Sequence, residues 1–176
     1  MPSTVLVVDD EKNIQVTLSR ALSMAGHNVE VAGGGREALE KIAALPVDVV
    51  VMDVRMPDLD GLSVLEKARQ TRPDLPVVIM SGHGSLEIVR NAFKLGAFDY
   101  LEKPITEKDK LLIAVKNALA MQTLRAENAA LRRGGRARRA AAWRGRSPPW
   151  TAGQPRAAAP RSRRAASAWR GRSSPR

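Results

Sequence analysis

The 176-residue sequence contains no cysteine, which excludes disulfide bonds and metal sites built from thiolates. It has no uninterrupted apolar run of about 18 residues, the length that a membrane-spanning helix needs. It also lacks the charged segment, apolar core and cleavage site of an N-terminal signal peptide. These absences favour a cytoplasmic protein with one ordinary domain and an additional segment.

Acidic residues are confined to the first part of the chain. All 18 Asp and Glu lie before Gly134, so residues 1–133 carry a net charge of −1. Residues 134–176 contain 12 Arg and no acidic residue, which gives this segment, the basic tail, a net charge of +12. The overall net charge of +11 therefore combines two regions of different character.

The basic tail also lacks Leu, Ile, Val, Met and Phe, so it cannot bury a core and is expected to be disordered. Two interpretations compete. In one, Arg side chains contact nucleic-acid phosphates while Trp143, Trp150 and Trp169 stack on bases, which gives weak and non-specific binding. In the other, which the abrupt change at Gly134 favours, the tail is the product of a frameshift or a truncated gene. Arg, Ala, Gly and Pro are the residues of codons made only of G and C.

In residues 1–133, short apolar runs alternate with longer segments that have the apolar spacing of helices. The runs are rich in Val and Ile, as buried parallel strands are. Glycines such as Gly26 and Gly96 follow two of the helical segments and mark their ends. Five such units predict a doubly wound α/β fold with five parallel strands. The predicted strands are Val5–Val8, Val29–Val31, Val47–Met52, Val77–Met80 and Phe98–Leu101.

Polar side chains stand where four of these predicted strands end. Asp9 and Asp10 follow the first strand, and Asp53 follows the third. Ser81 follows the fourth strand, and Lys103 lies near the end of the fifth. In open α/β sheets, sites form at the carboxyl ends of the strands, so we expect these five side chains to converge. A plainer interpretation, in which the acidic doublet lies in water and caps the next helix, does not account for the whole set.

Three converging carboxylates repel one another, at a cost of about 4 kcal/mol for each pair at about 4 Å and an effective dielectric constant of about 20. A hard divalent cation removes that cost, and ligands that are all oxygen atoms select Mg²⁺ over softer metals. The sequence therefore predicts a Mg²⁺ site at this edge of the sheet.

Four motifs resemble those of the response-regulator receiver domain, the phosphorylatable part of bacterial two-component signalling. They are VVDDE (7–11), VVMDVRMPDLDG (50–61), IMSGHG (79–84) and AFDYLEKP (97–104), and the resemblance covers residues 1–120. The last motif and LRAENAALRR (124–133) are similar to the receiver and linker of NtrC-like regulators, in which a sigma-54-activating ATPase follows. No G-x-x-x-x-G-K-[ST] phosphate loop and no helix-turn-helix pattern occur in this sequence.

The resemblance implies a flavodoxin-like fold with Asp53 as the phosphoacceptor. It implies that Asp9, Asp10 and Asp53 surround Mg²⁺, with the backbone carbonyl of Arg55 as a further ligand. The phosphoryl group would come from the histidine of a sensor kinase. The chain would then be a phosphoacceptor switch and not an enzyme, with self-catalysed transfer and slow autodephosphorylation only.

The same resemblance implies roles for three further residues. Lys103 and Ser81 would contact the phosphoryl oxygens, and Ser81 would move toward them. Tyr100 would then turn from exposed to buried and alter the face formed by the fourth helix, fifth strand and fifth helix. Plainer alternatives are a solvated lysine, a serine that caps the fourth helix and a surface tyrosine. Asp58 and Asp60 are interpreted as loop and turn residues before Gly61.

The fifth helix is expected to continue through residues 121–133 as a linker. Apolar residues and one Asn fit heptad positions a and d, and an Asn at position a fixes the register of a coiled-coil dimer. Only about two heptads are present, so a solvated helix end is an equal alternative. The predicted organisation is a receiver domain at 1–120, this linker and the basic tail. The heptad residues are Met121, Leu124, Asn128 and Leu131.

Overall fold

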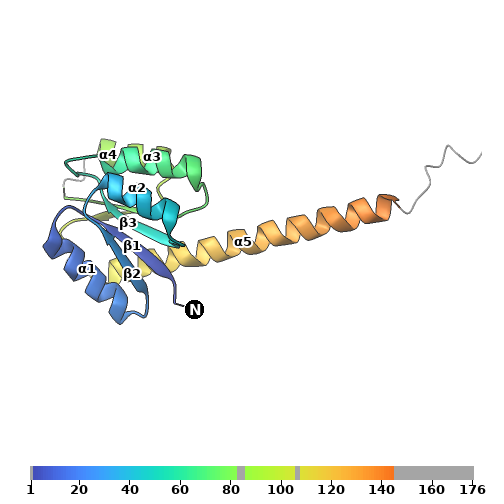
Figure 1. The fold of residues 1–176 in the computed structure, drawn as a ribbon, viewed down its shortest axis with the longest axis horizontal. Coiled ribbons are helices and arrows are strands. Elements are labelled where there is room, and N and C mark those ends of the chain that lie inside the picture. Colours follow the sequence, from blue (N-terminus) through green and yellow to red (C-terminus); the bar gives the residue numbers. More distant parts are fainter. Residues whose placement is uncertain (1, 83–85, 106–107, 145–176) are drawn as a thin grey trace, which may run out of the picture. The chain divides into compact units, whose positions relative to one another are not determined.

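The computed structural model describes residues 2–82, 86–105 and 108–144, and of residues 133–144 the backbone alone. Five strands alternate with five helices along the chain, as the sequence predicts (Figure 1). The strands are β1 (Thr4–Val8), β2 (Asn28–Ala32), β3 (Val49–Asp53), β4 (Val77–Ser81) and β5 (Asp99–Glu102). The helices are α1 (Lys12–Met24), α2 (Gly35–Ala44), α3 (Gly61–Thr71), α4 (Leu86–Lys94) and α5 (Lys108–Arg144).

The strands form one parallel sheet in the order β2-β1-β3-β4-β5. The chain first adds β2 on one side of β1 and then β3, β4 and β5 on the other, so the sheet is doubly wound. Because all strands run in the same direction, their carboxyl ends share one edge. This confirms the predicted fold class and brings the ends of β1 and β3 side by side.

Two apolar cores lie on the two faces of the sheet. Alternate residues of β1 enter different cores: Leu6 and Val8 pack with residues of α2, α3 and α4, whereas Val5 and Val7 pack with residues of α1 and α5. The central strands are therefore buried on both sides, and their Val-rich runs have no polar alternation. Helices on both faces hold the sheet and leave its carboxyl edge for a site.

The structure differs from the sequence prediction at the start of the basic tail. Disorder was expected from Gly134, but α5 continues through Gly134 and Gly135 to Arg144. Each glycine costs about 1 kcal/mol relative to alanine in a helix. Residues 136–144 are Arg, Ala and one Trp, and Ala and Arg are among the strongest helix formers. The remaining tail, residues 145–176, lies outside the described residues.

Within the described part of the chain, no helix has the length and apolar character needed to cross a membrane.

Candidate functional site

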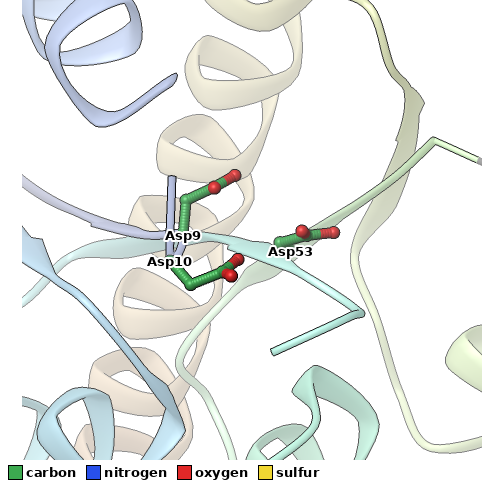
Figure 2. A group of neighbouring side chains, drawn as sticks. All are labelled: Asp9, Asp10 and Asp53. Atoms are coloured by element: carbon green, nitrogen blue, oxygen red, sulfur yellow. The ribbon is translucent and has the colours of Figure 1, made fainter. Parts of the chain in front are cut away.

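Two neighbouring strands bring three carboxylates together. Asp9 directly follows β1 and Asp53 ends β3, and the pairing of Val8 with Met52 sets them next to each other. Together with Asp10 they gather at the carboxyl edge (Figure 2), where one oxygen atom of each carboxylate lies within 4.8 Å of the others. Asp9 is fully buried and Asp53 is 6% exposed, whereas Asp10 is exposed.

Lys103 bridges two of these carboxylates. Its Nζ atom lies 2.6 Å from Oδ2 of Asp9 and 2.9 Å from Oδ2 of Asp53. The residue follows β5, where its backbone N–H donates to the carbonyl of Ser81 at 2.9 Å and a cis peptide bond joins it to Pro104. Lys103 is thus anchored at its backbone as well as at its ammonium group.

Burial lowers the pKa of the Lys103 ammonium group, but the hydrogen bonds and charges of Asp9 and Asp53 outweigh it, so this pKa lies above its ordinary value of 10.5. Lys103 is therefore a cation at neutral pH. Three carboxylates and one ammonium group leave this cluster with an excess of negative charge. That excess and the oxygen-only donor set fit a divalent cation such as Mg²⁺.

Ser81 ends β4 and is fully buried at the same edge. The register pairs Met80 with Asp53, so Ser81 stands one residue beyond the acidic end of β3. The structure thus brings Asp9, Asp53 and Lys103 into direct contact and places Ser81 at the adjoining strand end.

The loop between β3 and α3, residues 54–60, carries Arg55. Val54 and Met56 are buried, whereas Arg55 is exposed. The backbone N–H of Gly61 closes the loop by donating to the carbonyl of Val54 at 2.9 Å. A Cβ atom at Gly61 would lie 2.2 Å from the carbonyl oxygen of Asp53, so only glycine permits this approach. The loop and Asp10 border an open cleft beside the carboxylates.

Comparisons with known proteins agree with this geometry. The family model described as response regulator receiver domain matches residues 5–116. The chain belongs to this family. The family predicted from the motifs is thereby confirmed, and receiver domains generally bind Mg²⁺ through acidic residues and are phosphorylated on an aspartate.

Relatives of this receiver domain include longer regulators. A putative NtrX-like response regulator of Rickettsia bellii is 41% identical over 126 residues, which are 70% of this chain and 26% of the relative. The DNA-binding transcriptional regulator NtrC of Escherichia coli is 41% identical over 116 residues, which are 66% of this chain and 24% of NtrC. The chain thus spans about a quarter of the length of these relatives.

Solved structures show the same fold. NtrX from Brucella abortus, in complex with ADP, has a TM-score of 0.70 and 35% sequence identity over 74% of this chain and 30% of that chain. A CheY-like receiver domain protein from Methanospirillum hungatei has a TM-score of 0.68 and 30% identity over 71% of this chain and 99% of that chain. The receiver fold thus accounts for the ordered sheet and its helices.

Tyr100 lies in β5, beside Ile79 of β4, and is partly buried against the core that includes α4. Its hydroxyl oxygen is buried and has no hydrogen-bond partner among the described residues. A buried hydroxyl without a partner costs free energy relative to a hydrogen-bonded one.

Two acidic residues of the β3–α3 loop, which the sequence predicts only as loop and turn residues, make specific contacts in the structure. Asp60 is the N-cap of α3, and its carboxylate accepts hydrogen bonds from the backbone N–H of Ser63 at 2.9 Å and from its hydroxyl at 2.8 Å. The spacing of three residues could have indicated this cap. Asp58 contacts the start of α2, which is distant in sequence, so no local pattern pointed to it.

Proposed function

We propose that Asp53 is the phosphoryl acceptor of this receiver and that the donor is the phosphohistidine of a sensor kinase. The observation that supports this most directly is the contact of 2.9 Å between the Asp53 carboxylate and the Lys103 ammonium group, beside two further carboxylates. In the transfer, a P–O bond forms to an Asp53 oxygen while the P–N bond of the donor breaks. The electron pair of that bond remains on the histidine nitrogen.

The chain supplies position and charge for this step. Asp9, Asp10, Asp53 and the carbonyl of Arg55 would hold Mg²⁺, which when bound neutralises charge on the phosphoryl oxygens. Lys103, held as a cation by its two carboxylate partners, would add a second positive charge at the acceptor. The buried Ser81 would donate its hydroxyl hydrogen to a phosphoryl oxygen.

The signal would then pass to the face formed by α4, β5 and α5. Ser81 and Tyr100 lie on the neighbouring strands β4 and β5, where Tyr100 pairs with Ile79, two residues before Ser81. A two-state change of Tyr100, biased by the new charge on Asp53, is the proposed switch. The cytoplasmic location expected from the sequence belongs to the same proposal.

The test is phosphorylation of the full chain with acetyl phosphate and MgCl₂, followed by intact-mass measurement. We expect the wild type to gain the mass of one phosphoryl group, and both Asp53→Asn and the wild type with EDTA to gain none. Asp60→Asn is the matched control, because it removes a carboxylate from the neighbouring loop and should still be labelled. Labelling of Asp53→Asn at the wild-type level would show that the acceptor is another residue.

A second candidate function rests on the basic tail, whose 12 Arg and absence of acidic residues suit nucleic-acid binding. Deletion of residues 134–176 should leave labelling of Asp53 intact. If the tail is the output, the same deletion should also abolish salt-sensitive retention of the protein on DNA. Unchanged retention after the deletion would exclude the tail as a nucleic-acid-binding output.

A homodimer through α5 is a further part of the proposal. Met121, Leu124 and Leu131 are 41%, 54% and 74% exposed, as an unpaired heptad seam would be. Asn128 uses its side-chain amide to donate to the carbonyl of Leu124 at 3.1 Å, so it would have to exchange this bond for one across a dimer. Light scattering across a range of concentrations, with Leu124→Lys as the disrupting variant, measures whether the seam pairs.

A further inference from the structure

The β3–α3 loop is fastened to the start of α2 by one carboxylate. Oδ1 of Asp58 accepts a hydrogen bond from the backbone N–H of Gly35 at 3.0 Å, and Oδ2 accepts one from the N–H of Arg36 at 3.1 Å. Gly35 and Arg36 are the first two residues of α2, and the preceding Gly34 has no side chain that could cap the helix. Two of the free N–H groups at the start of α2 therefore donate to a residue of the loop that carries Arg55.

The glycines at the start of α2 make this contact sterically possible. A Cβ atom at Gly34 would lie 2.8 Å from Oδ1 of Asp58, and one at Gly35 would lie 2.4 Å from the backbone carbonyl oxygen of Leu59. A side chain at position 34 would displace the Asp58 carboxylate, and one at position 35 would collide with the loop backbone. Gly34 and Gly35 thus provide the surface against which the loop packs.

The negative charge of Asp58 is favourable at the N-terminus of α2. Hydrogen bonds from the backbone N–H groups of Arg36 and then Gly35 lower the pKa of this carboxyl group below its ordinary value of 3.8. A carboxylate at a helix N-terminus also interacts favourably with the helix dipole. Although Asp58 is exposed, it is therefore oriented by two hydrogen bonds rather than free in solvent.

The two ends of the loop are fixed by other bonds. The N–H of Val54 donates to the carbonyl of Met80 at 2.9 Å, and the N–H of Gly61 donates to the carbonyl of Val54 at 2.9 Å. Between these ends, Asp58 ties the loop to an element outside the β3–α3 connection, three residues beyond Arg55. Asp58 thus gives the loop a third attachment, close in sequence to Arg55.

We propose that Asp58 is a positioning residue for the metal site. Through the backbone N–H groups of Gly35 and Arg36, it holds the β3–α3 loop so that the Arg55 carbonyl is available to the cation. The inference rests on the proposed function, because it takes that carbonyl as a Mg²⁺ ligand. Coupling between two sites is reciprocal, so Mg²⁺ binding should in turn stabilise the contact at the start of α2.

Three variants separate positioning from loss of charge. Asp58→Ala removes the charge and both acceptor atoms, whereas Asp58→Asn removes the charge and keeps a side-chain oxygen that can accept from α2. Asp60→Asn removes the same charge from the same loop, where the carboxylate caps α3 and not α2. Because Val54 and Met56 remain buried, all three variants should fold, which circular dichroism checks.

The experiment measures Mg²⁺ binding by calorimetry and amide hydrogen exchange at Gly35 and Arg36, with the full chain and MgCl₂ alone. We expect Mg²⁺ to slow exchange at both amides in the wild type. Asp58→Ala should raise the Kd for Mg²⁺ by up to about fivefold, the factor that matches the free energy of a lost helix cap if all of it is coupled to metal binding. It should also abolish the Mg²⁺-dependent slowing. Asp58→Asn should raise the Kd less than Asp58→Ala does.

Two results would overturn the inference while leaving the proposed function intact. One is a Kd for Mg²⁺ that Asp58→Ala leaves unchanged. The other is an equal rise of the Kd in all three variants, which would mean that charge alone matters. Absence of Mg²⁺ binding to the wild type would instead overturn the proposed function and this inference with it.

Discussion

The first and second parts of α5 share one backbone conformation but have different surroundings. Up to Leu119, the helix buries four residues against the sheet and α1: Leu111, Ala114, Val115 and Ala118. From Ala120 onward, apolar side chains such as Leu124 and Leu131 are more than half exposed. Helix propensity is enough to form the second part, whereas tertiary contacts give the first part fixed side-chain positions.

Charged residues of the receiver domain and of the second part of α5 also differ in burial. The Lys103 side chain is 12% exposed and contacts two carboxylates, whereas Arg125 and Arg132 lie exposed on the second part of α5. A charge held in a buried cluster affects both stability and chemistry, but an exposed charge is largely screened by water and salt. The receiver domain and the end of its last helix should therefore respond very differently to similar substitutions.

Truncation of one leucine in each part of α5 should give the largest difference in the free energy of unfolding. Leu111→Ala removes a fully buried side chain and should lower the free energy of unfolding by about 2–5 kcal/mol. Leu124→Ala removes a side chain that is 54% exposed and should change the free energy of unfolding by less than about 0.5 kcal/mol. Urea unfolding followed by circular dichroism measures both. A large loss in Leu124→Ala would mean that the second part is covered in solution, as in a dimer.

Lys103→Met tests how much the buried ion pairs at the carboxyl edge of the sheet contribute to stability. It leaves the buried Asp9 and Asp53 without their ammonium partner and should cost about 1.5–3 kcal/mol of unfolding free energy. Excess MgCl₂ should recover part of this loss, because a bound cation replaces the missing positive charge. Lys116→Met, on the exposed side of α5, is the control and should be near neutral. Equal losses in the two variants would contradict a special role of the buried pair.

The pH dependence of stability isolates the same contact. The pKa of Lys103 is raised above its ordinary value of 10.5 in the folded protein. Its contribution is therefore complete below about pH 10.5 and is lost as the pH rises through the folded pKa. The difference in unfolding free energy between wild type and Lys103→Met should be constant from neutral pH up to about that pH and shrink above it. A difference that already shrinks between neutral pH and pH 10 would contradict the raised pKa.

The smallest effect concerns the far end of α5. Replacement of Gly134 and Gly135 by alanine should stabilise the helix locally by about 1 kcal/mol per residue, because glycine is the weaker helix former. Helicity measured by circular dichroism should rise, while labelling of Asp53 should not change. Unchanged helicity would mean that the helix in solution ends before these glycines.

Much of the fold could be predicted because its signals are local. Val-rich runs predicted all five strands with ends within two residues, and helical spacing and terminal glycines predicted a helix after each of them. The site residues Asp9, Asp53, Ser81 and Lys103 could be grouped because parallel strands end at one edge. The composition of the basic tail predicts disorder from Gly134, but Arg and Ala also favour helix, which accounts for the extension of α5 past this residue.

The sequence by itself determined the order of elements, the direction of the strands and the residue types at their carboxyl ends. Only the tertiary structure decided that Lys103 lies between Asp9 and Asp53, and that Asp58 caps a helix more than twenty residues away in sequence. Periodicity and capping patterns act over a few residues and can be recognised along the chain. Contacts between distant segments depend on strand order and register, which are set when both faces of the sheet are buried.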